Sequence, residues 1–217
     1  MNVIAIDTAG PVIGVGLATA AGTFCRTERI QRGADARLVP WVHEVLEEAS
    51  LNISEVSGVA VASGPGSFTG LRVGMAVGMG LSQALDIPVW GAPSWVHRAH
   101  AVDSSSVLVL LDARKGRVYA AHVCDGILVN GPVDMEPETV LAWSLPSDTH
   151  VTGEGARVYE ALIQSRDLHI VVDPSTPSVG ALAELGIHAF QEGVGERAFT
   201  LRPQYLRDAD AKKPTKK

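Results

Sequence analysis

The fold depends on one stretch of sequence, Ser63-Gly-Pro-Gly-Ser-Phe-Thr-Gly-Leu-Arg-Val-Gly74. It follows an apolar run at 56–63 that predicts a buried strand, and it opens an apolar segment at 68–85 that predicts a helix. Free backbone N–H groups at such a turn favour anions. However, no Lys-Ser or Lys-Thr pair follows the glycines as in a P-loop, and Thr69 stands where a dinucleotide fingerprint has its third glycine. The sequence therefore does not favour generic phosphate binding.

Glycine is spaced regularly in this segment. Four glycines recur at every fourth residue: Gly66, Gly70, Gly74 and Gly78. Each glycine in a helix interior costs about 1 kcal/mol relative to alanine. The pattern therefore predicts close packing of this helix face against another backbone.

A second helix is predicted over 35–50, where apolar residues recur at spacings of three and four, opposite a glutamate-rich side. The apolar stripes of both helices can be either a partner interface or the core of their own lobe. The interface hypothesis rests on Trp41 and Arg72, which are residue types common in binding hot spots. Two matching helix pairs can then meet as a four-helix bundle. The predicted interface residues are Leu38, Trp41, Val42 and Val45 with Leu71, Arg72, Met75 and Met79.

The chain contains an internal repeat. The apolar run at 3–6 ends at Asp7 and is followed by a turn and a second strand-like run. The run at 107–111 ends at Asp112 and continues in the same way, about half a chain later. Strands then alternate with helices in both halves, which predicts a duplicated two-lobe α/β fold. We expect a first lobe at 1–101 and a second at 102–217, with the last segment returning to the first lobe and a basic tail from about 208.

This order of elements resembles the actin, sugar-kinase and heat-shock ATPase (ASKHA) class. The resemblance implies that Asp7, Thr8 and Asp112 mark a nucleotide cleft between the lobes, since strand carboxyl ends deliver side chains to such crevices. Alternatively, each aspartate accepts backbone N–H bonds of its own turn. The turn at 8–11 has one glycine and a proline that lacks an N–H, which suits phosphate poorly. We therefore expect at most a degenerate nucleotide cleft.

Composition and charge exclude several classes of protein. The 217 residues are 46% hydrophobic and carry a net charge of −6, and residues 1–207 alone carry 14 basic against 22 acidic side chains. Such an acidic body attracts nucleic acid poorly. The start of the chain meets Asp7 without a basic segment, and the uncharged run at 73–85 is too short for a bilayer. With Cys25 and Cys124 predicted as buried thiols, we expect a cytoplasmic protein that does not bind membranes.

The histidines do not predict a metal site. None of the seven lies four residues from another, and His97 and His100 lack a third convergent ligand. We expect these two to form a solvated surface pair.

Three segments together resemble one family. They are the glycine-rich motif at 64–74, Ile4-Ala-Ile-Asp-Thr8, and Leu111-Asp-Ala-Arg-Lys-Gly-Arg-Val-Tyr119. They are similar to the TsaB (YeaZ) family of tRNA threonylcarbamoyladenosine biosynthesis proteins, and the resemblance runs from Met1 to Arg207. Ala34-Asp35 stand where the family usually has His-Ser, so no role is carried over to those positions.

The resemblance implies a non-catalytic scaffold. Family members bind the TsaD threonylcarbamoyltransferase as a heterodimer through two helices of the first lobe, and serve N6-threonylcarbamoyladenosine formation on the tRNA adenosine next to the anticodon. TsaE, an ATPase, docks on the pair, and TsaC supplies threonylcarbamoyl-adenylate. ATP or ADP and the metal are then expected on TsaD and TsaE, with no cofactor on this chain and tRNA bound only through the complex. A homodimer of the chain alone stays open.

Two other functions are alternatives to this scaffold. An actin-like, ATP-dependent phosphotransferase or hydrolase acting alone is favoured by the repeated strand–aspartate–hairpin. A peptidase, an old label for this superfamily, lacks an activated nucleophile or a metal in the sequence.

Overall fold

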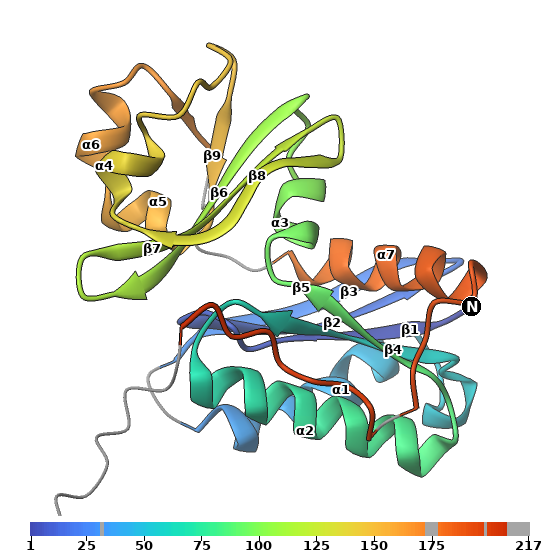
Figure 1. Cartoon of the computed structure of the whole chain (residues 1–217). Coiled ribbons are helices and arrows are strands. Elements are labelled where there is room, and N and C mark those ends of the chain that lie inside the picture. Colours follow the sequence, from blue (N-terminus) through green and yellow to red (C-terminus); the bar gives the residue numbers. More distant parts are fainter. Residues whose placement is uncertain (31–32, 172–177, 198, 208–217) are drawn as a thin grey trace, which may run out of the picture.

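The first half of the chain folds around a five-stranded mixed sheet (Figure 1). The computed structural model describes residues 1–30, 33–171, 178–197 and 199–207. The strand order is β3-β2-β1-β4-β5. Central β1 pairs antiparallel with β2 and parallel with β4, and all its residues are buried. The strands are β1 (Val3–Asp7), β2 (Val12–Thr19), β3 (Gly22–Arg29), β4 (Gly58–Gly64) and β5 (Val89–Pro93).

The second half repeats this arrangement. Its sheet has the order β10-β9-β6-β7-β8, and β6 pairs antiparallel with β7 and parallel with β9. The same relations hold for β1 with β2 and β4, so the predicted duplication is confirmed. The strands are β6 (Ser106–Arg114), β7 (Arg117–Cys124), β8 (Ile127–Met135), β9 (His150–Thr152) and β10 (His169–Ile170).

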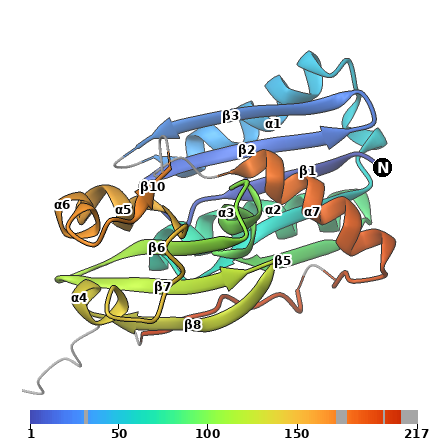
Figure 2. The ribbon, with the colours of Figure 1, turned by 90° about the horizontal axis from the view of Figure 1, so that it is seen from above.

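Helices cover both faces of the first sheet. Helices α1 (Ala34–Glu48) and α2 (Phe68–Leu85) pack on one face, and α7 (Val179–Gln191) packs on the other (Figures 1 and 2). A short 3₁₀ turn, Ile53–Glu55, precedes β4. Because α7 follows all strands of the second lobe, the chain crosses back to the first sheet. The division after residue 101 stays a prediction.

The remaining helices are shorter. Helix α3 (Val96–His100) contacts both α7 and β6. The other three are α4 (Pro137–Val140), α5 (Glu154–Val158) and α6 (Glu160–Gln164). Helices α5 and α6 are separate because the backbone leaves helical geometry at Tyr159. The basic tail predicted from about 208 lies outside the described residues.

The spaced glycines bring α2 against the first sheet. A Cβ added to Gly66 would lie 2.6 Å from the Ala9 carbonyl oxygen, and one on Gly78 would strike the Val61 side chain. Additions at Gly70 and Gly74 would strike Thr8. The close approach is thus made to β4 and to the turn between β1 and β2. Gly80 differs, since a Cβ added there meets no atom within 4 Å.

The cysteines are less buried than the sequence suggests. Cys25 is exposed and Cys124 is half-buried, which corrects the prediction of two buried thiols. The reason for Cys25 is that β3 is an edge strand with mostly exposed side chains. In the described part of the chain, no helix is long and apolar enough to cross a membrane.

Two glycine substitutions in α2 test this packing. We expect Gly78→Ala to lower the free energy of unfolding by about 1–3 kcal/mol, since the new methyl group collides with Val61. Gly80→Ala should raise it by up to about 1 kcal/mol, because only helix propensity changes. Urea unfolding of both variants measures the difference. Equal effects of the two substitutions would contradict the packing described above.

Candidate functional site

A buried polar cluster lies where the two lobes meet, with Asp7 at its centre. Both oxygens of this fully buried carboxylate have hydrogen-bond partners. Oδ1 accepts the backbone N–H of Ala9 at 2.7 Å, and Oδ2 lies 2.8 Å from both His97 Nε2 and Arg98 Nη1. His97 and Arg98 come from α3, so the cluster fastens α3 to the carboxyl end of the central strand.

The charges of this cluster follow from burial and proximity. Burial alone raises the pKa of Asp7, but the Arg98 charge and the His97 hydrogen bond outweigh it and hold the pKa far below its ordinary value. Burial lowers the pKa of His97, so its imidazole is neutral near pH 7 and donates its Nε2–H to Asp7. Arg98 Nη1 also donates to the Ser94 carbonyl oxygen at 2.7 Å. The cluster is therefore an aspartate–arginine ion pair with a neutral histidine donor.

The second lobe contributes Glu154, at the start of α5, to the surroundings of this cluster. Glu154 is only 5% exposed, and a Cβ added to Gly10 would lie 3.2 Å from its Oε1. No described group hydrogen-bonds Glu154 Oε2. Burial raises the pKa of Glu154, and the nearby Arg98 charge opposes this rise. The buried surroundings of Glu154 therefore shift its equilibrium toward the protonated acid.

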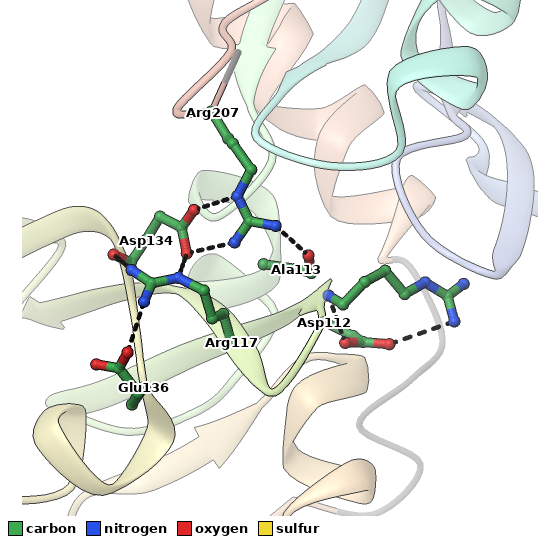
Figure 3. A network of polar contacts seen from close by, with 7 residues as sticks. Asp112, Ala113, Arg117, Asp134, Glu136 and Arg207 are labelled. Carbon is green, nitrogen blue, oxygen red and sulfur yellow. Dashed lines mark hydrogen bonds and ion pairs between the residues drawn. The ribbon is translucent and has the colours of Figure 1, made fainter. Parts of the chain in front are cut away.

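Asp112 occupies the position in the second lobe that Asp7 holds in the first. Its side chain is 18% exposed, and its Oδ1 accepts the backbone N–H of Arg114 at 2.9 Å (Figure 3). The negative charges of Asp7 and Asp112 both raise the pKa of Glu154, so both predicted cleft aspartates act electrostatically on this carboxyl. Each aspartate also accepts a backbone N–H of its own turn, which is the alternative that the sequence left open. Thr8, the third predicted cleft residue, donates to the Gly70 carbonyl oxygen at 2.7 Å.

Sequence reasoning missed three members of this cluster. His97 was expected at the surface with His100, but His97 is fully buried and only His100 is exposed. Arg98 and Glu154 gave no pattern that could have identified them, because their partners lie far away in sequence. Among the described residues, no group of three or more His, Cys, Asp or Glu could hold a metal ion.

The structure corrects most of the predicted partner interface. Six of its eight residues are buried within the first lobe: Leu38, Trp41, Val42, Val45, Leu71 and Met75. The apolar side of α1 packs on the sheet and on α2, so these side chains fill the core of the first lobe and leave little surface for a partner. Met79 is half-buried against the same core, and only Arg72 is exposed.

A different side of α2 faces solvent. It consists of four exposed residues spaced one turn apart, which we call the outward face of α2: Arg72, Ala76, Gly80 and Ala84. Arg72 is the only charged residue among the 18 residues of the helix. Helices that stay in water normally carry a charged outer side. The outward face is therefore unusually suited to contact with another protein.

The fold places the chain in a known structural class. It aligns with Lmo2764 of Listeria monocytogenes, a proposed N-acetylmannosamine kinase, at a TM-score of 0.50 and 14% identity, over 89% of this chain and 100% of that one. At such identity the likeness concerns the fold alone. The chain has the duplicated two-lobe α/β fold of the actin, sugar-kinase and heat-shock ATPase class.

The sequence comparisons are more specific. A family model described as "TsaD: tRNA N6-adenosine threonylcarbamoyltransferase" matches residues 28–215. An uncharacterized protein of Mycobacterium tuberculosis is 35% identical, over 97% of this chain and 94% of its own length. The tRNA threonylcarbamoyladenosine biosynthesis protein TsaB of Escherichia coli is 30% identical over 56% of this chain, a match that spans 54% of the E. coli protein.

The structure of YeaZ from Pseudomonas aeruginosa agrees with these matches. It superposes with a TM-score of 0.79 and 27% identity, covering 94% of this chain and 99% of its own. The chain belongs to the family that the TsaD model describes and, within it, to the TsaB (YeaZ) proteins.

The Asp7 cluster predicts a large stability effect. Asp7→Asn should lower the free energy of unfolding by about 3–5 kcal/mol, since it leaves Arg98 as a buried and uncompensated charge. Asp112→Asn is the matched control, because its partner Arg114 is 78% exposed. We expect the control to cost less than about 1 kcal/mol in the same urea titration. Similar losses of stability for both variants would contradict the expectation that only the buried Asp7 compensates a buried charge.

Glu154 predicts a pH-dependent effect. Its raised pKa means that the folded state binds this proton more tightly than the unfolded state. The wild type therefore loses stability as the pH rises above the ordinary carboxyl range and through the folded pKa. Glu154→Gln removes this loss. The melting temperature of the variant should therefore rise relative to that of the wild type as the pH increases from 5 to 8. A difference in melting temperature that stays constant with pH would contradict the raised pKa of the buried Glu154.

Proposed function

We propose that this chain is a non-catalytic subunit that binds a TsaD-family threonylcarbamoyltransferase and supports N6-threonylcarbamoyladenosine formation on tRNA. The named TsaB relatives carry this pathway in their names. The outward face of α2 is the observation that carries the proposal. The interface proposed here consists of these exposed residues, which a partner can reach, and no longer of the buried residues predicted from the sequence.

Gly80 supports a closely packed partner on this face. The other glycines of α2 are explained by contact with the β1–β2 turn and with β4, but Gly80 faces open space. A glycine there costs helix stability of about 1 kcal/mol without any gain inside the chain. With Ala76 and Ala84 one turn away on either side, it allows a second helix to approach closely. A helix of the transferase fits such a surface.

The inter-lobe cluster favours a binding role over independent ATP chemistry. In this fold class the carboxyl end of the first strand faces the ligand crevice. Here both oxygens of Asp7 are engaged by the chain's own Ala9, His97 and Arg98. An aspartate held in this way stabilises the lobe junction instead of holding a nucleotide.

The charge of the chain fits an indirect role on tRNA. Residues 1–207 carry a net charge of −8, which repels a polyanion. We therefore assign the contact with tRNA, the nucleotide and the metal to the partner proteins. In this proposal the ATPase TsaE docks on the pair formed by this chain and the transferase. TsaC supplies threonylcarbamoyl-adenylate, and the complex works in the cytoplasm.

One substitution on the outward face tests the proposal. Ala76→Glu should leave the fold intact, because the site is exposed, but should weaken binding to the organism's own TsaD-family transferase at least tenfold. The matched control is Ala161→Glu, an exposed alanine in helix α6 of the second lobe. Affinity is measured by calorimetry, with circular dichroism melts for folding. No binding by the wild type, or equal binding by both variants, would overturn the proposed interface.

A further inference from the structure

An exposed aromatic cluster continues the outward face of α2 at the start of the helix. The rings of Phe68 and Tyr205 stack with centroids 5.1 Å apart, and the Arg72 guanidinium lies 3.7 Å from the Phe68 centroid. Arg72 Nε also donates to the Tyr205 hydroxyl at 3.1 Å. Phe68 is 39% and Tyr205 40% exposed. Aromatic and arginine side chains at such places are the usual anchors of protein interfaces.

The charge of Arg72 indicates what would cover this cluster. None of the ion pairs in the described part of the chain involves Arg72, although its side chain is exposed on α2. Its Nη groups can therefore form a charge-assisted bond with a carboxylate from outside. The occupant suggested by this chemistry is an acidic side chain on the helix that packs along the outward face.

Tyr205 belongs to a C-terminal segment that joins the two lobes, which we call the strap, residues 201–207. The strap begins at Leu201, buried in the core of the first lobe. In its middle, the Gln204 backbone N–H donates to the Ser63 carbonyl oxygen at 2.7 Å. The strap thus passes directly along the end of β4 before it reaches the base of α2.

The strap ends on the second lobe at Arg207 (Figure 3). Arg207 Nε and Nη2 bind the two carboxylate oxygens of Asp134 in β8 at 2.7 and 2.9 Å, and Nη1 donates to the Ala113 carbonyl oxygen at 3.1 Å. Asp134 is also bound by Arg117 at 2.6 Å. Such a bidentate, partly buried pair is geometrically specific, unlike a single surface ion pair.

We propose that Phe68, Arg72 and Tyr205 form an anchor that receives an acidic side chain of the transferase, and that the Arg207–Asp134 pair positions Tyr205 in this anchor from the second lobe. This inference rests on the proposed function and adds a second contact region to it. The second lobe thereby contributes to binding without touching the partner through its own sheet.

A double-mutant cycle tests the anchor and its positioning. Affinity for the organism's own transferase is measured by calorimetry for the full chain carrying Tyr205→Ala, Arg207→Gln or both. We expect Tyr205→Ala to weaken binding about tenfold and Arg207→Gln three- to tenfold. Because Arg207 acts through Tyr205, the double variant should be no weaker than Tyr205→Ala. Arg157→Gln, which breaks an exposed ion pair in the second lobe, is the control and should change nothing.

Two further measurements separate positioning from general stability. Tyr205→Phe keeps the ring stack and should retain most of the affinity. Amide exchange of the segment 203–206 should quicken in Arg207→Gln while the strands of both sheets keep their protection. Unchanged exchange in this segment would overturn the positioning role.

The outcomes distinguish this inference from the proposed function. If the wild type binds the transferase and Ala76→Glu prevents it, but Tyr205→Ala and Arg207→Gln do not weaken binding, the anchor is refuted and the proposed function stands. If the wild type does not bind, both fail. If Tyr205→Ala abolishes self-association instead and leaves transferase binding unchanged, the occupant is a second copy of this chain and the inference is overturned.

Discussion

The contact between α2 and the first sheet is too close for any side chain, and the rest of the first lobe is arranged around that constraint. The glycines at 66, 70, 74 and 78 meet the β1–β2 turn and β4 without a Cβ between them. Because the helix is fixed at this distance and rotation, its opposite side must face outward. The same contact places the start of α2 beside the turn that holds Asp7, where the lobes meet.

Duplication has produced two halves with the same strand order and different chemistry. In the first half, the aspartate that ends the central strand is buried and paired with α3. In the second half, the equivalent Asp112 stays partly exposed and pairs weakly with its own turn. Burial makes the first aspartate structural, since an unpaired charge there would be costly. The remaining acid, Glu154, is buried near both aspartates, and this burial raises its pKa.

The features that point to a partner lie mainly on the first lobe, but the strap connects the second lobe to them. The strap carries Tyr205 to the base of α2 and ends in the Arg207–Asp134 pair on β8. A contact of this kind couples the position of one surface side chain to a strand of the other lobe. The net negative charge of residues 1–207 and the single cation on α2 are the charge features on which the proposed protein-binding role rests.

The sequence alone determined the local elements and their repetition. Hydrophobic spacing indicated a helix at 68–85, the aspartates at 7 and 112 indicated the duplication, and the glycine spacing indicated a close backbone contact. Each of these patterns is visible along the chain without knowledge of what packs against it. The tertiary structure decided what covers each surface. An apolar stripe shows that a helix side avoids water but not what it packs against, so Leu38 and Met75 were assigned to a partner although they fill the core. His97 with Asp7 and Arg207 with Asp134 are 90 and 73 residues apart. Only the packing of the folded chain brings such pairs together.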